Sequence, residues 1–343
     1  MRRPKVAAVC RSISMGLVLV CTILGLGTVS GDAAPPQLST VRVAGAASLS
    51  AAPHFIADKE GFFARQGIRF EFIVIPTFGE ASGPLLQGQI DVFSGPVSAG
   101  FFNAVAAGQR ARIVAGAGYY APGDKTAALV VRKDLMGAAV KRLADLRGHT
   151  IAVNSIRGTS QYLIEKILAR DNLKVSEVRF VRMPFSAMVA ALLNRAVDAA
   201  FFGEPWITLA ERQGSAVPII YVGEATPGED TGSVLTYGPR LLDRDRALGQ
   251  RFMVAFLQGL RQYMRGQTDR NVNIIAEFLK IDPVAVREAT WFSMYLDGRL
   301  DASGVRRFQD WLYDIGEVQL RSPLDQLLDM SFAQQAARAL ERP

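Results

Sequence analysis

The sequence predicts an α/β fold built from two lobes of one design. Two segments repeat a helix–aspartate–strand–glycine pattern, with Asp91 and Asp198 at equivalent places 107 positions apart. A strand, a small-residue loop and a helix precede each of these segments, and the chain after Arg240 has mostly helical apolar spacing. Repeated βαβ-containing units of this kind form parallel sheets covered by helices. About 310 residues in these units are enough for two such lobes.

The first 31 residues predict a secretory leader that lies outside the fold. Four basic residues between Arg2 and Arg11 precede an uncharged apolar run from Ile13 to Val29, and small residues follow. This order is typical of a leader, and an uncleaved membrane anchor is the alternative because the run is slightly long. We therefore expect residues 1–31 to be removed on export to the periplasm.

Charge and cysteine content exclude several functions. Without the leader, 35 basic and 32 acidic residues remain, a net charge of +3, and no block of basic residues suggests nucleic-acid binding. Both cysteines, Cys10 and Cys21, lie in the leader, so the remaining chain has no thiol; its only histidines are His54 and His149. We expect no metal, no cofactor and no hydrolytic triad.

The repeated segments are "LLQGQIDVFSG" (Leu85–Gly95) and "LLNRAVDAAFFG" (Leu192–Gly203). Each predicts the end of a helix, a structural aspartate, a short buried strand and a new helix. Pro96 and Pro205 follow the strands, and proline favours the first position of a helix. We therefore expect these two prolines to open the helices.

The chain is expected to cross between the lobes twice, near 116–121 and near 221–228. These crossings place residues 38–118 and 224–343 in one lobe and 119–223 in the other. The strand–loop–helix segments at 41–63 and 150–168 put Ser, Thr and Gly residues after their strands. Because ligands bind beyond the carboxyl ends of strands in such sheets, we expect the binding site there.

Four stretches together carry a family resemblance: "LSAAPHFIADKEGFFARQGIRFEFI", "LLQGQIDVFSG", "LADLRGHTIAVNSIRGTSQYLIEKIL" and "VDAAFFGEPW". Over most of residues 41–240 the chain resembles the periplasmic solute-binding proteins of ABC importers for nitrate, taurine and aliphatic sulfonates. Relatives also bind thiamine-pyrimidine precursors. The resemblance implies a type II-like periplasmic-binding-protein fold, two lobes with two crossovers at a hinge, closing over a small ligand. The chain lacks the cysteine run of the pyrimidine synthases that share this fold.

The segment "VNSIRGTSQYLIEKIL" predicts a helix whose first turn faces the site. Gly158, Thr159 and Ser160 offer backbone N–H groups and two hydroxyls at a helix start, a combination that favours an oxyanion. The alternative is that the two hydroxyls only cap the helix. Arg157 beside them could pair with an anion or remain in solvent.

Other candidate ligand-binding residues follow the remaining strands or lie at the hinge. Glu204 could accept an N–H group from the ligand or stabilise a helix start, and Trp206 could stack on a flat ligand or pack in the core. Tyr119 and Tyr120 lie at the expected hinge, where residues line the floor of the cleft, and Tyr119 is taken as the candidate ligand-binding residue. The candidates in the first lobe, each of which could instead be a cap or core residue, are Ser48, Ser50, His54, Ser94, Gly95 and Ser98.

These features together predict the exported substrate-binding component of an ABC importer, a monomer without enzymatic activity. It would capture a small organic, sulfonate-like anion and deliver it to a membrane permease and its ATPase. An enzyme on the same fold, such as a pyrimidine synthase or a dehydratase of menaquinone synthesis, is the first alternative, and the leader argues against it. A ligand-sensing module is the second, although no signalling or DNA-binding segment is visible.

Overall fold

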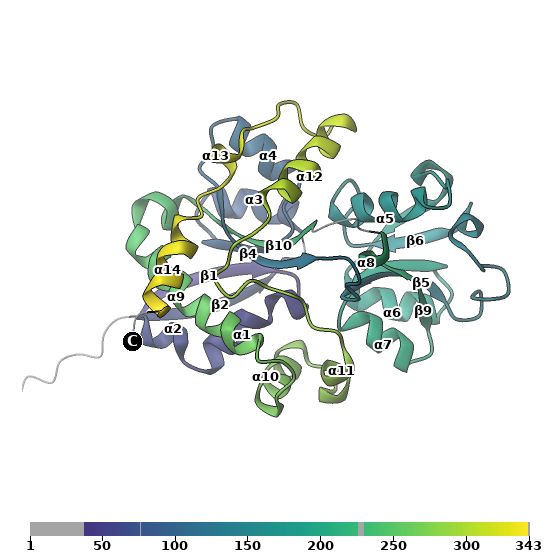
Figure 1. Cartoon of the computed structure of the whole chain (residues 1–343), viewed down its shortest axis with the longest axis horizontal. Helices are drawn as coiled ribbons and strands as arrows, with labels where there is room; N and C mark the ends of the chain where they lie inside the picture. Colours follow the sequence, from purple (N-terminus) through teal and green to yellow (C-terminus); the bar gives the residue numbers. More distant parts are fainter. Residues whose placement is uncertain (1–37, 76, 226–229, 342–343) are drawn as a thin grey trace, which may run out of the picture. The chain divides into compact units, whose positions relative to one another are not determined.

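The computed structural model describes residues 38–75, 77–225 and 230–341, and the expected leader lies outside these ranges. The described chain contains two five-stranded mixed sheets (Figure 1). The first sheet has the order β2-β1-β3-β10-β4 and the second has the order β7-β6-β8-β5-β9. The two orders correspond strand for strand, as the repeated pattern predicts.

The strands of the first sheet come from both ends of the described chain. They are β1 (Ser39–Gly45), β2 (Ile68–Val74), β3 (Val92–Gly95), β4 (Arg112–Tyr120) and β10 (Asp230–Tyr237). The strands of the second sheet lie between the two crossings. They are β5 (Ala127–Arg132), β6 (Thr150–Val153), β7 (Arg179–Arg182), β8 (Ala199–Gly203) and β9 (Ala216–Tyr221).

In each sheet the first three strands are parallel and the last two are antiparallel to their neighbours. β1 pairs in parallel with β2 and β3, and β6 pairs in parallel with β7 and β8. The antiparallel fourth strand is β10 in the first sheet and β5 in the second, and each directly follows a crossing from the other sheet. Each sheet therefore receives its fourth strand from the part of the chain that has just left the other sheet.

Helices cover both sheets. Those grouped with the first sheet are α1 (Ala52–Lys59), α2 (Phe62–Arg65), α3 (Phe78–Leu86), α4 (Ala99–Ala106), α9 (Arg246–Tyr263), α10 (Asp269–Leu279), α11 (Pro283–Glu288), α12 (Ala302–Asp314), α13 (Leu324–Leu327) and α14 (Ser331–Glu341), with a 3-10 turn at Leu49–Ala51 and a π-helix at Arg240–Arg244. Those grouped with the second are α5 (Thr159–Ala169), α6 (Phe185–Leu193), α7 (Trp206–Arg212) and α8 (Val222–Ala225), with 3-10 turns at Leu143–Leu146 and Val175–Glu177. We call each sheet with its helices a lobe.

Alternate side chains of the second sheet are buried on opposite faces. Phe202 packs in one core cluster with residues of α6 and α7, whereas Phe201 belongs to the cluster that includes residues of α5. Strands covered on both faces are expected to be continuously apolar, as "AAFF" is. The short buried strand predicted after Asp198 is therefore confirmed.

Two details differ from the sequence prediction. Ser98 has extended backbone angles and helix α4 begins at Ala99, so Pro96 is not its first residue. Pro205 is the residue before α7 and likewise not its first residue. Residues 116–120 still belong to β4, and the next strand, β5, begins at Ala127. The exact residues at which one lobe passes into the other stay a prediction.

Candidate functional site

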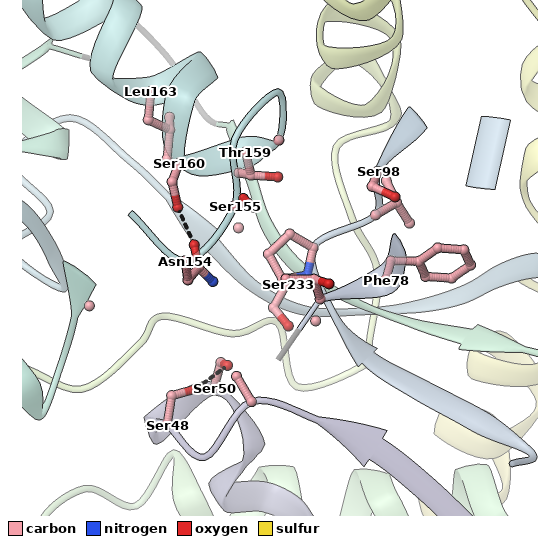
Figure 2. A pocket seen from close by; sticks show the side chains of 18 of the residues that line it. Ser48, Ser50, Phe78, Ser98, Asn154, Ser155, Thr159, Ser160, Leu163 and Ser233 are labelled. Atoms are coloured by element: carbon pink, nitrogen blue, oxygen red, sulfur yellow. Dashed lines mark hydrogen bonds between the residues drawn. The ribbon is translucent and has the colours of Figure 1, made fainter. Parts of the chain in front are cut away.

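A cavity of about 310 Å³ lies between the two lobes, at the carboxyl ends of β1, β3, β6 and β8. Ser48 and Ser94 follow or end strands of the first lobe, while Asn154 and Gly203 do so in the second. Figure 2 shows side chains of both lobes facing this space. A volume of this size is at the lower end of the range for sites that take organic ligands.

The structure brings together nine of the twelve sequence-predicted site residues. They line one cavity, although the two lobes contribute them from segments more than 100 positions apart, and their role in binding stays a prediction. They are Ser48, Ser50, Ser94, Gly95, Ser98, Gly158, Thr159, Ser160 and Glu204.

His54 does not line the cavity. It is fully buried, its Nδ1 lies 3.2 Å from the carbonyl oxygen of Ala51, and its ring packs 4.8 Å from that of Phe256. Helix α1 turns this face toward α9 and away from the site. Burial lowers the pKa of His54 to about 3, so the imidazole is neutral at physiological pH.

Tyr119 and Trp206 also lie outside the cavity. Tyr119 stacks on Tyr295 with ring centroids 4.6 Å apart, while its neighbour Tyr120, on the other side of β4, lines the cavity. Trp206 is buried in the core of the second lobe, and its indole Nε1 donates to the carbonyl oxygen of Ala47, 3.3 Å away. Trp206 thus joins the lobes beside the site instead of stacking on a ligand.

Helix α5 presents an N-terminus without a side-chain cap to the cavity. It begins at Thr159 with Gly158 as the preceding residue, and no side chain accepts from its first turn. The Ser160 hydroxyl donates instead to Asn154 Oδ1, 2.5 Å away (Figure 2). The predicted alternative that Ser160 caps the helix is therefore wrong, and the first-turn N–H groups are available to an acceptor.

Gly158 is required by the loop itself. A Cβ at this position would lie 2.5 Å from the Ser155 hydroxyl oxygen. The preceding Arg157 has a left-handed φ of 56°, an uncommon conformation for a residue with a side chain. Small residues in this stretch therefore permit a tight turn between β6 and α5.

Three hydroxyls on the first-lobe side of the cavity have no hydrogen-bond partner among the described residues: those of Ser94, Ser98 and Ser233. Ser94 and Ser233 lie on the adjacent strands β3 and β10 and are 3% and 2% exposed. Ser98 precedes α4 and does not cap it. Sequence reasoning missed Ser233, whose place depends on β10 returning to the first sheet.

The Glu204 carboxylate already has hydrogen-bond donors within the protein. Its carboxylate accepts hydrogen bonds from the backbone N–H of Thr208 at 3.1 Å, from the Thr208 hydroxyl at 2.9 Å and from the backbone N–H of Thr290 at 3.3 Å. Burial raises its pKa to about 7, and these hydrogen bonds oppose the rise. The structure favours stabilisation of the start of α7 over acceptance from a ligand.

Two arginines at the cavity pair with acidic residues of the other lobe. Arg157 Nη1 lies 2.8 Å from Glu317 Oε1, and Arg182 Nη2 lies 2.9 Å from Glu80 Oε1. Arg157 is thus exposed to solvent on one side and already paired with a carboxylate. The two ion pairs connect the lobes across the site.

Five aromatic side chains also line the cavity. From the sequence, only Tyr120 among them is expected at the floor of the cleft, because buried aromatic residues are also typical of the core. They are Phe78, Tyr120, Phe185, Phe201 and Phe292.

Two α/β lobes of matching topology with a cavity between them form the fold that the chain shares with a periplasmic nitrate-binding protein. The chain belongs to the NMT1-like family, whose model matches residues 34–268. Proteins of Brucella abortus and Brucella suis, provisionally named binding proteins, are 26% identical over 144 residues, which is 41% of this chain. The match spans 44% of their length.

Solved structures share the fold over most of the chain. The periplasmic nitrate-binding protein NrtA of Synechocystis has a TM-score of 0.72 at 18% identity, with 90% of both chains covered. The periplasmic aliphatic sulphonate-binding protein SsuA of Escherichia coli has a TM-score of 0.65 at 18% identity, covering 86% of this chain and 92% of its own. The desulfurization enzyme DszB matches with a TM-score of 0.65 at 18% identity, covering 88% of this chain and 100% of its own.

Within the described residues, no helix combines the length and apolarity needed to cross a membrane. Within the same residues, no group of three or more His, Cys, Asp or Glu side chains is arranged to hold a metal ion.

Proposed function

We propose that this chain is the exported substrate-binding component of an ABC importer, and that it captures a small organic oxyanion between its lobes. The observation that carries this proposal is the 310 Å³ cavity, formed by equivalent strand ends of two duplicated lobes. The similarity to sulfonate- and nitrate-binding proteins of the periplasm supports the same class. A permease and an ATPase in the membrane would be its partners.

The polar groups around the cavity favour an oxyanion. The first turn of α5 has no side-chain cap, and a helix N-terminus carries about half a positive charge with unpaired N–H groups. Thr159 lies beside that turn on the cavity wall. No additional arginine is needed, because backbone N–H groups at a helix start can hold an anion.

The aromatic wall favours an organic ligand over a bare inorganic anion. Phe78 comes from the first lobe, and Phe185 and Phe201 come from the second, so apolar surface faces the cavity from both sides. A small inorganic ion would leave these rings uncovered, whereas an apolar ligand body would bury them at about 25 cal/mol per Å². We therefore expect a sulfonate or carboxylate with an alkyl or aryl body.

Binding would act through closure of the lobes. A ligand that contacts both lobes binds the closed arrangement more tightly than the open one. This difference in affinity shifts the equilibrium toward the closed arrangement. Contacts between the lobes, including the hydrogen bond from Trp206 to Ala47, would support the closed arrangement beside the cavity.

The cavity wall does not favour an enzyme. Neither histidine of the described chain lines it, no cysteine occurs in the described residues, and the Glu204 oxygens already accept three hydrogen bonds. Nucleophilic catalysis needs a nucleophile with a neighbouring base, which this set of residues does not offer.

A thermal-shift series on the exported protein tests the proposal. Hexanesulfonate, benzoate, taurine and nitrate are added separately, and the midpoint of unfolding is measured. A ligand at 100 times its dissociation constant adds about 2.7 kcal/mol to the free energy of unfolding. We expect hexanesulfonate or benzoate to raise the midpoint more than nitrate does. Equal or larger stabilisation by nitrate would contradict the organic ligand.

A further inference from the structure

One aromatic side chain of the cavity wall comes from a connecting segment instead of a strand or helix. Phe292 lies between α11 and α12, yet it lines the same cavity as residues of both lobes. It is 6% exposed, and its ring centroid lies 5.5 Å from that of Tyr120. A ring that closes one side of a ligand cavity limits the size of the ligand that fits.

The backbone around Phe292 is fixed by hydrogen bonds to other parts of the chain. The Phe292 N–H donates to the hydroxyl oxygen of Tyr263 in α9, 2.8 Å away. The carbonyl oxygen of the next residue accepts from the N–H of Tyr119 in β4 at 3.2 Å, and Thr290 donates to Glu204 at 3.3 Å. The segment is therefore bonded to both lobes, and its ring has a defined place in the cavity wall.

Glycines from both lobes surround the Phe292 ring. A Cβ at Gly118 of β4 would lie 2.7 Å from Cδ1 of the ring, and one at Gly232 of β10 would lie 3.2 Å from Cε1. Gly203, at the end of β8, approaches the other edge of the ring, where a Cβ would lie 4.0 Å from Cε2. Because glycine has no side chain, backbone can approach the ring this closely.

We propose that Phe292 determines the length of the organic solute that the protein accepts, because its ring forms a rigid end wall of the cavity. This inference rests on the proposed function and adds a specificity-determining residue to it. A ring enclosed on both edges by strand backbone has little room to change its rotamer. The body of a bound solute therefore ends where the ring begins.

The small volume of the cavity makes an end wall decisive for selectivity. At about 310 Å³ the cavity is at the lower end of the range for organic ligands, so a few methylene groups decide whether a solute fits. Each methylene group that is buried tightens binding about fourfold. Once the body reaches the ring, a further methylene group strains the wall or the ligand and weakens binding. Affinity for straight-chain sulfonates should therefore rise with length, pass through a maximum and fall.

The test measures how the preferred length changes when the ring is made smaller. Straight-chain alkanesulfonates from ethanesulfonate to decanesulfonate are titrated into the protein expressed from its full-length chain, and calorimetry gives each dissociation constant. Phe292→Ala removes the ring. Phe292→Leu removes less volume and is included because truncating a buried ring to alanine strongly lowers stability. Melting temperatures are measured on every variant without ligand.

Two control variants separate the end wall from general effects on the fold and on the cavity. Trp291→Phe changes the neighbouring side chain, which stacks on Tyr263 with ring centroids 4.8 Å apart and does not line the cavity. It should melt lower than the wild type and keep the wild-type preferred length. Phe185→Leu shortens an aromatic side chain of the cavity wall that is partly exposed to solvent. It should weaken binding of all members of the series by similar factors.

We expect Phe292→Ala to increase the preferred length by about three methylene groups and Phe292→Leu to increase it by fewer. The ratio of the dissociation constant for hexanesulfonate to that for decanesulfonate should rise at least about tenfold in the alanine variant. If the wild type binds the series and both Phe292 variants keep its preferred length, the inference is overturned and the proposed function stands. If neither the wild type nor the variants bind any member, the oxyanion of the proposed function is contradicted together with the length selectivity.

Discussion

The Glu204 carboxylate accepts a hydrogen bond from the backbone N–H of Thr290, 3.3 Å away, and so links α7 to the segment that follows α11. The same carboxylate holds the first turn of α7 through Thr208. Glu204 is 4% exposed, and its burial raises its pKa to about 7. A carboxyl group in this state makes the stability of the protein depend on pH near neutrality.

Glu204→Gln should change that dependence. Because the folded pKa is above the unfolded value near 4.5, the folded state binds the proton more tightly, and stability is lost as pH rises from 4.5 through 7. Over this range the wild type should lose on the order of 3 kcal/mol relative to the Gln variant. Urea unfolding of both proteins at pH 5 and pH 8 measures the difference. Parallel changes in the two proteins would show that Glu204 does not titrate there.

His54 should make the stability of the protein depend on pH in the opposite direction. Its folded pKa is about 3, below the unfolded value of 6.5, so the folded state loses stability as pH falls from 6.5 toward 3. Between pH 7.5 and 4.5 the wild type should lose about 2–3 kcal/mol relative to His54→Leu. Chemical denaturation at these two pH values tests this, and an identical loss in the Leu variant would contradict it.

The ion pair between Arg157 and Glu317 should favour the closed lobes only slightly. Side-chain exposures of 66% and 28% mean that water screens the pair, and such pairs contribute about 0.2–1 kcal/mol. Arg157→Gln should therefore weaken ligand binding by at most about fivefold, and 0.5 M salt should remove the difference. Arg142→Gln is the control, because Arg142 pairs with Asp171 within the second lobe. A larger loss that persists in salt would mean that Arg157 binds the ligand directly.

The repeated elements could be predicted because the sequence signals for each of them lie within one short stretch of the chain. The Asp91 carboxylate accepts from the backbone N–H of Arg42 in β1 at 2.9 Å, and that of Asp198 accepts from the N–H of Thr150 in β6 at 3.0 Å, so each is bonded to its neighbouring strand. Asp91 also pairs with Arg240. Hydrophobic spacing and one acid are enough to indicate this arrangement, and the structural role predicted for both aspartates agrees with these contacts.

Which individual side chains face the cavity is harder to predict than the elements that carry them. Successive residues of a strand point to opposite faces, so deciding that Tyr120 and not Tyr119 lines the cavity requires knowledge of which face of β4 meets it. His54 lies on α1, a short helix whose inward face is set by packing against α9. Ser233 carries no local signal, because it reaches the site only when β10 pairs with β3. Such residues depend on contacts between distant segments.

Closure of the lobes should be measurable in solution. Direct contacts between the lobes include the 3.3 Å hydrogen bond from Trp206 to Ala47 and the ion pairs Arg157–Glu317 and Arg182–Glu80. A bound solute would add contacts to both lobes and shift the population toward the closed form. Small-angle scattering should show a smaller radius of gyration with saturating hexanesulfonate than without it. An unchanged radius under proven saturation would remove the closure mechanism and leave ligand binding intact.

Substitutions at the start of α5 distinguish a binding role of its residues from a structural one. Ser160→Ala loses the hydrogen bond to Asn154 and should lower stability by about 1 kcal/mol, with little direct effect on affinity. Thr159→Ala removes a hydroxyl for which the structure shows no partner and should leave stability nearly unchanged. If Thr159 binds the charged head or body of the solute, its loss should cost about 1.5–3 kcal/mol of binding, roughly a ten- to hundredfold rise in the dissociation constant.

Gly158→Ala completes this series. Its Cβ would lie 2.5 Å from the Ser155 hydroxyl oxygen, so the turn must shift and both stability and affinity should fall. Replacing Ser155 by glycine in the same chain removes the obstructing hydroxyl and should restore part of the stability. Calorimetric titration with hexanesulfonate, with melting temperatures measured on each variant, distinguishes the cases. Wild-type affinity in Thr159→Ala together with reduced stability in Ser160→Ala would show that this loop only supports the helix, and the ligand contacts would then lie on the first lobe alone.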